Sequence, residues 1–145
     1  MKKYLHHNIG SLAQIGQYTT ILPDSKLEIE GKLFINDLVG LTGSEISFNS
    51  VAPQMFMKFS HKHKTHEEVY IILSGQGEFV ADDERIMVSE GSVIRMDKEV
   101  ERTWRNSSKS EDLVFIVIQT LPNSIDNSKP TDDGILVNGD YWGEA

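Results

Sequence analysis

The sequence of 145 residues contains no cysteine. This absence excludes a disulfide scaffold, catalysis by a thiolate and zinc bound by cysteines, and it favours a cytoplasmic protein. No uninterrupted apolar stretch approaches the roughly 20 residues that a membrane-spanning helix needs. Two lysines near the N-terminus are not followed by a continuous apolar segment, so we expect neither a signal peptide nor a membrane partner.

Basic residues are also scarce, with 14 Lys and Arg against 22 Asp and Glu and a net charge of −8. A protein that binds nucleic acid usually neutralises phosphates with basic side chains, so this balance argues against a nucleic-acid partner. The negative charge is most simply explained by solubility. The length fits one domain with a core of its own.

What the sequence does contain is a series of short β-type runs separated by turn residues. The expected strands lie at 26–30, 32–41, 45–51, 55–63, 68–74, 78–81, 85–88, 92–96, 100–105 and 113–120. Glycines at Gly75 and Gly77 predict one hairpin, and Asp82-Asp83 predicts a second. Many short strands without a 3.6-residue period indicate an all-β sandwich or barrel.

The same pattern predicts the domain organisation. Residues 26–121 form the barrel, and residues 1–25 are an N-terminal extension or a swapped strand. Residues 122–145 read as a polar tail that wraps the barrel or a neighbouring subunit, with Tyr141 and Trp142 as anchors. A disordered tail without anchors is the alternative.

The stretch with the clearest chemistry runs from His61 to Gly75, HKHKTHEEVYIILSG. Side chains alternate between the two faces of a strand, so His61 and His63 point to the same side. Glu68 begins the next apolar run and adds a carboxylate to the same pocket. Two imidazoles and one carboxylate form a ligand set for iron, manganese, nickel or zinc.

This stretch resembles the first motif of the cupin superfamily: His-x-His, three or four residues, Glu, six residues, Gly. The family pattern also has a glycine six positions before the first histidine, where this chain has Met55. The second cupin motif reads Gly, five residues, Pro-x-Gly, two residues, His, three residues, Asn.

The counterpart of the second motif begins at Gly91 and ends at Asn106. Asp97 stands where proline is expected, and Glu99 where glycine is expected. Arg102 stands where the fourth metal ligand, a histidine, is expected. The first motif is therefore intact, and the second has lost its histidine.

The resemblance implies an antiparallel double-stranded β-helix, or jelly-roll barrel, that is open at one end. It also implies a pocket for a small-molecule ligand and a homodimer. Cupins include enzymes and non-catalytic sensing domains, so the resemblance does not decide whether this protein is an enzyme. A third reading is an interaction protein that uses its barrel as a scaffold.

Arg102 has two interpretations, because a guanidinium cannot ligate a metal. It either holds the carboxylate of a substrate beside a metal bound by His61, His63 and Glu68, or it replaces the metal by pairing with Glu68 in a metal-free binding module.

Further candidates for the pocket are Tyr70, Trp104 and His66. The two aromatic residues are otherwise core residues, and the histidine is otherwise an exposed loop residue. Met55, Met57 and Phe59 are expected to form the apolar floor below the histidines.

Overall fold

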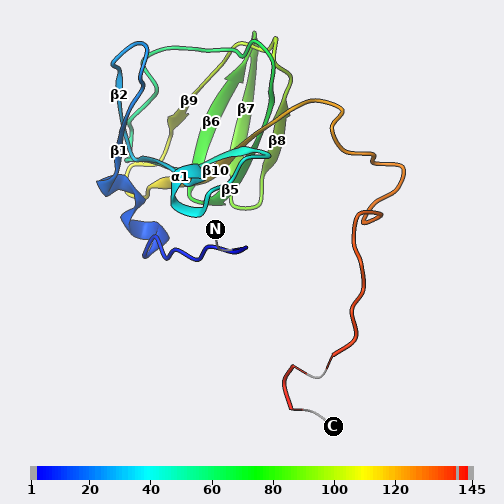
Figure 1. Cartoon of the computed structure of the whole chain (residues 1–145). Coiled ribbons are helices and arrows are strands. Elements are labelled where there is room, and N and C mark those ends of the chain that lie inside the picture. The colour runs from blue at the N-terminus through cyan, green and yellow to red at the C-terminus, as the bar shows by residue number, and fades with distance from the viewer. Residues whose placement is uncertain (1–2, 140, 144–145) are drawn as a thin grey trace.

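The structure is a computed structural model that describes residues 3–139 and 141–143, and its strands pair into three antiparallel sheets (Figure 1). The elements in chain order are η1 (Leu12–Gln17), β1 (Thr19–Ile21), β2 (Glu28–Glu30), β3 (Lys32–Phe34), α1 (Asn36–Val39), β4 (Glu45–Val51), β5 (Glu67–Ser74), β6 (Gln76–Ala81), β7 (Glu84–Ser89), β8 (Val93–Met96), β9 (Arg102–Asn106) and β10 (Leu113–Thr120).

A five-stranded sheet in the order β3-β4-β10-β5-β8 faces a three-stranded sheet in the order β7-β6-β9. Buried aromatic rings from both sheets meet between them. Phe79 of β6 lies 5.2 Å from Tyr70 and 5.7 Å from Phe115 between ring centroids, and it stacks on Trp104 at 5.5 Å. This contact of the two inner faces forms the core and confirms the predicted all-β, antiparallel jelly-roll barrel.

The strands predicted at 45–51 and 113–120 are observed with these bounds. The run at 32–41 is different, because β3 ends at Phe34 and a helical turn follows. Asn36 stabilises this turn, since its side-chain amide donates to the carbonyls of Leu41 and Ser44. The left-handed φ of 65° at Gly40 then ends the turn. The prediction of one strand over 32–41 is therefore wrong beyond Phe34.

The predicted hairpin across Gly75 is also wrong, because β5 and β6 belong to different sheets. The chain crosses from one sheet to the other at Gly75, which has a φ of 82°. A Cβ atom at this position would overlap the backbone carbonyl oxygen of Asp112. Glycine is therefore required for the crossing itself. The second predicted hairpin, β6–β7 across Asp82, is confirmed.

Residues 55–63 do not form the regular strand that their alternation predicts. They run along β9 and join it through two isolated bridges, Phe56 with Arg105 and His61 with Arg102. Met55 is 49% exposed, so its predicted place in an apolar floor is wrong. Met57 is partly buried and packs against the core as expected.

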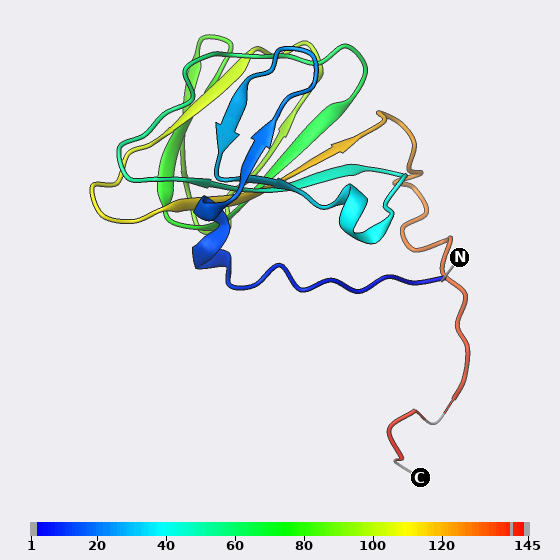
Figure 2. The same ribbon diagram turned by 60° about the vertical axis from the view of Figure 1, so that its left-hand side comes forward.

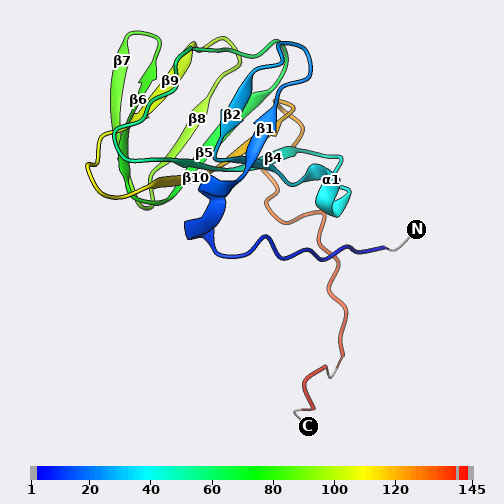
Figure 3. The ribbon, with the colours of Figure 1, turned by 90° about the vertical axis from the view of Figure 1, so that its left-hand side faces the viewer.

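The two ends of the chain differ. β1 pairs with β2 of its own chain, and this two-stranded sheet lies along one side of the barrel (Figure 3). After Thr120 the described residues contain no helix or strand, and they lead away from the barrel (Figure 2). The described tail residues are not packed on the barrel of their own chain, and Tyr141 and Trp142 are 69% and 87% exposed. Within the described residues, no helix is long and apolar enough to cross a membrane.

Candidate metal centre

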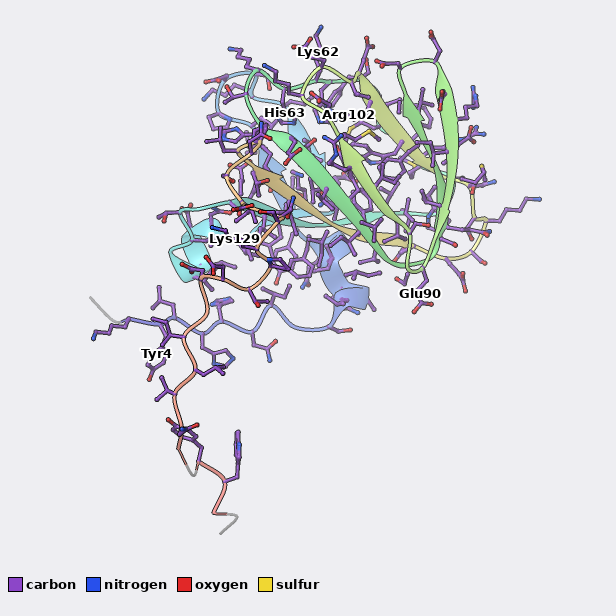
Figure 4. The ribbon with its side chains drawn as sticks, turned by 90° about the vertical axis from the view of Figure 1, so that its right-hand side faces the viewer. Tyr4, Lys62, His63, Glu90, Arg102 and Lys129 are labelled. Atoms are coloured by element: carbon purple, nitrogen blue, oxygen red, sulfur yellow. The ribbon has the colours of Figure 1, made fainter. Side chains whose placement is uncertain are left out.

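His61 and His63 are fixed by the backbone of the segment beside β9. His61 exchanges two hydrogen bonds of 3.0 Å with the backbone of Arg102, and the backbone N–H of His63 donates to the carbonyl of Lys98 at 3.0 Å. Both imidazoles therefore point to the same side, although the segment is not a regular strand. Lys62 between them is exposed, and Figure 4 shows it at the outer edge of the barrel, at the opposite end from Glu90.

Glu68 lies on β5, where side chains alternate between the barrel interior and the outer face. Glu68, Tyr70 and Ile72 are the buried members of this alternation. One carboxylate oxygen, Oε1, lies 3.0 Å from Nε2 of His63 and 3.6 Å from Nε2 of His61. The Tyr70 hydroxyl donates a hydrogen bond of 2.7 Å to the same oxygen.

These distances fit a shared metal ion. The ligand atoms of His61, His63 and Glu68 all lie within 4.8 Å of one another. Neighbouring ligands that lie about 2.1 Å from one ion are separated by about 3.0–3.4 Å, depending on the geometry. The separations of 3.0 and 3.6 Å to Glu68 are therefore close to those of a facial two-histidine, one-carboxylate set. His66 is exposed and lies outside this group, so the structure does not place it in the pocket.

Arg102 is fully buried at the start of β9, and Figure 4 shows it inside the barrel near His63. Its Nη2 lies 3.2 Å from Oε1 of Glu68, and its Nη1 donates to the carbonyl of Val100 at 2.5 Å. Nε and Nη2 have no hydrogen-bond partner within the part of the chain that the structure describes. Arg102 and Glu68 thus form an ion pair by distance, without an aligned hydrogen bond.

The surroundings of Glu68 keep it ionised. Burial by itself would raise its pKa, but the nearby imidazoles of His61 and His63 and the hydrogen bond from Tyr70 outweigh burial and lower the pKa well below its ordinary value. Burial and the Glu68 charge raise the pKa of Tyr70 well above its ordinary value. Tyr70 therefore remains a hydrogen-bond donor to a charged carboxylate.

A cavity of about 240 Å³ opens beside these groups. It is lined by Leu22, Ile29, Lys32, Phe34, Glu45, Ser47, Met57, Phe59, His61, Glu68, Trp104, Val117 and Gln119. Trp104 is thus both a core residue and a wall of the cavity. Tyr70 and Arg102 do not line this cavity, although both contact Glu68. Arg102 instead borders a second cavity of about 350 Å³, together with Met57 and Phe59.

Lys32 is the functional candidate that the sequence did not reveal. Its Nζ lies 3.0 Å from the Ser47 hydroxyl and 3.0 Å from Oδ1 of Asn49, and 4.7 Å from the centre of the Phe34 ring. Burial lowers its pKa to about 8, although the carboxylates of Glu68 and Glu45 oppose this effect. The sequence signal that could have indicated this site was the pair of polar residues Ser47 and Asn49 on one face of β4. In the sequence alone, such a face is interpreted as exposed to solvent, but in the fold it points into the barrel.

Comparison with known proteins agrees with this architecture. Residues 50–119 match the family model of the cupin domain. This span contains His61, His63, Glu68 and Arg102, whereas Lys32 lies outside it. No protein in the curated set matches the chain.

The chain is also similar to solved structures. A cupin protein from Bacteroides fragilis aligns with a TM-score of 0.74 and 27% identity, over 94% of this chain and 100% of that chain. A Photorhabdus luminescens protein aligns with a TM-score of 0.61 and 18% identity, over 84% and 90%. A predicted oxalate decarboxylase from Thermotoga maritima aligns with a TM-score of 0.54 and 23% identity, over 66% and 83%. The last two likenesses show the fold alone.

Proposed function

We propose, from the match of residues 50–119 to the cupin domain and the geometry of the site, that this chain binds a divalent transition metal and acts on a small polar or carboxylated metabolite in its barrel. His61, His63 and Glu68 would hold the ion, which is iron, manganese, nickel or zinc.

One observation carries this proposal. Two imidazole nitrogens and a carboxylate oxygen from separate segments converge within 4.8 Å, and two of these residues, His61 and Glu68, line the cavity. A carboxylate oxygen and two imidazole nitrogens can supply the lone pairs that a divalent cation needs. A bound ion would supply a Lewis acid with open positions for a ligand.

The other residues of the site hold this group in place. Tyr70 donates to Oε1 of Glu68 and fixes the direction of the carboxylate. Trp104 packs edge-on against the His61 ring, with 5.8 Å between centroids, and limits its rotation. The apolar walls from Met57, Phe59 and Val117 exclude part of the water from the cavity, which strengthens polar contacts inside it.

Metal analysis of the full chain purified without chelator tests the proposal. We expect bound transition metal in the wild type and none in the double variant His61→Ala with His63→Ala. His66→Ala is the matched control, because His66 is exposed and lies outside the group, and it should keep the metal. A wild-type protein that contains no metal and takes up none of the four ions would contradict the proposal.

A second function is favoured by the ion pair of Arg102 with Glu68 at 3.2 Å. In this alternative the guanidinium takes the place of the metal, and the barrel binds a small molecule without catalysis. Ligand-dependent thermal stabilisation that persists in excess chelator would support it, and loss of that stabilisation on removal of metal would support the metal-dependent function instead.

A further inference from the structure

Strand β4 presents polar residues to the inside of the barrel. Ser47 and Asn49 are only 1% and 5% exposed, whereas Ile46 and Phe48 on the other face of the strand are half-buried. Strands of an antiparallel sheet usually turn apolar residues inward. Burying a hydroxyl and an amide stabilises a fold less than burying apolar side chains does. The inward position of these polar side chains is therefore better explained by a role in ligand binding than by a contribution to fold stability.

The inward polar face of β4 holds Lys32 of the neighbouring strand β3. Lys32 is paired with Asn49 across the two strands, and its Nζ makes hydrogen bonds to Ser47 and Asn49. No carboxylate lies within ion-pair distance of it among the described residues. An ammonium group has three N–H donors, so two of them are used here and one is left.

Ser47 is left with a donor as well. Its hydroxyl oxygen accepts one hydrogen bond from Lys32 and one from the side-chain amide of Asn49, both at 3.0 Å. Both lone pairs are then used, and the hydroxyl hydrogen has no acceptor within the described part of the chain. Lys32 and Ser47 both line the cavity. The cavity wall thus contains an ammonium group and a hydroxyl group, each with one hydrogen-bond donor that no residue of the described chain uses.

We propose that Lys32 and Ser47 form a carboxylate-binding subsite at the β3–β4 side of the cavity. The subsite rests on the proposed function, since it takes the cavity as the ligand site. A carboxylate has two oxygens and can accept one hydrogen bond from each of these donors. Glu45 also lines the cavity, but its own carboxylate accepts a hydrogen bond of 3.0 Å from the amide of Gln119.

The rest of the cavity limits the size and character of the ligand. A volume of about 240 Å³ lies below the usual range of about 300–1,000 Å³ for sites that hold drug-sized molecules. Apolar side chains, among them Leu22, Ile29, Phe34 and Met57, form much of the wall. The ligand class is therefore a small monocarboxylic or dicarboxylic acid with an apolar body, whose charged end lies at Lys32 and whose body extends toward His61 and Glu68.

The experiment is a binding titration of the full chain at pH 7, in which calorimetry and changes in amide NMR signals detect binding. The probes are butyrate, benzoate, 3-phenylpropionate, malonate and succinate, each with its neutral amide. Lys32→Met removes the charge at similar length, and Ser47→Ala removes the hydroxyl. Lys109→Met is the matched control, because Lys109 is exposed on a loop.

We expect at least one carboxylate to bind the wild type and its amide to bind more weakly. Lys32→Met should weaken carboxylate binding on the order of tenfold to a hundredfold, the range of one charge-assisted hydrogen bond. Ser47→Ala should weaken it less, and Lys109→Met should leave it unchanged. Equal binding by wild type and Lys32→Met, or no binding by any of these acids, overturns the subsite.

Metal uptake measured on the same samples separates the two proposals. If Lys32→Met and the wild type bind metal equally and neither protein binds a carboxylate, the metal centre is supported and the subsite is overturned. Carboxylate binding that depends on Lys32, in a protein that contains no metal and takes up none of the four ions, supports the subsite and overturns the metal centre.

Discussion

Nη2 of Arg102 lies 3.2 Å from Oε1 of Glu68, and both side chains are buried. The same oxygen accepts a hydrogen bond from the Tyr70 hydroxyl and lies 3.0 Å from Nε2 of His63. The charge of the only buried carboxylate in the ligand group is therefore balanced by the protein itself. A divalent ion at this site would share Glu68 with an arginine, so we expect weaker metal binding than in a site without that cation.

Replacement of Arg102 provides the sharpest test of this relationship. Arg102→Gln should destabilise the metal-free protein by about 3–5 kcal/mol, because it leaves Glu68 buried without its counter-charge. Saturating zinc or nickel should restore part of this loss by supplying a cation, and about 2.7 kcal/mol is expected at a hundred times the dissociation constant. Urea unfolding with and without metal measures both effects.

Arg105→Gln is the control for that experiment. Arg105 is also on β9 and pairs with Glu78, but its side chain is 57% exposed. Its loss should cost about 1 kcal/mol or less, with no difference on adding metal. Equal effects of the two substitutions would contradict the cost assigned to the buried pair. No stabilisation of Arg102→Gln by either metal would argue that Glu68 is not a metal ligand.

Lys32 should make stability depend on pH in the alkaline range. Burial lowers its pKa to about 8 in the folded protein, against an ordinary value of 10.5. Between these values the unfolded chain binds more protons than the folded chain, so the Lys32 contribution to stability rises with pH. Below pH 8 the buried charge has its full destabilising effect.

Lys32→Met should therefore be more stable than the wild type at pH 7, and the difference should shrink as the pH rises from about 8 to 10.5. Unfolding in urea, followed by the fluorescence of buried Trp104, measures this difference at each pH. The exposed Lys109→Met should track the wild type throughout. A constant difference between Lys32→Met and wild type across this range would mean that Lys32 does not titrate there.

Gly75 should tolerate no side chain, for two reasons that can be separated. Gly75→Ala faces both a left-handed φ and an overlap with the Asp112 carbonyl, and should cost clearly more than 1 kcal/mol. Gly91→Ala has a similar φ of 87° but open space around it, so it should cost less. Gly43→Ala has neither problem and should be nearly neutral or stabilising. Thermal unfolding of the three variants should show this order.

The tail is the basis of a proposal about assembly. Ile135, Leu136 and Val137 are 88%, 99% and 75% exposed in the single chain, which is unfavourable for apolar side chains in water. We propose that this segment packs on a second copy of the chain in a homodimer. Light scattering after gel filtration should give a dimer for the full chain and a monomer after removal of residues 122–145. A monomeric full chain would contradict this.

The sequence by itself determined the fold class and the metal-ligand candidates, because both depend on local patterns. Alternation and turn residues defined most strands, and β4 and β10 were predicted with their observed bounds. The spacing of His61, His63 and Glu68 placed three metal-ligating groups in one predicted pocket. The structure brings the same three residues together.

Only the tertiary structure decided which strands pair and what faces the cavity. Gly75 looked like a hairpin turn, because local sequence shows where a chain bends but not which strand it meets next. Arg102 was expected at the pocket, and it contacts Glu68 but does not line the cavity that contains Lys32, since its position depends on β9 packing against the 55–63 segment. Lys32 became a site residue only because β3 pairs with β4 and the polar face of β4 turns inward. These facts arise from contacts between residues far apart in the chain, which no local pattern contains.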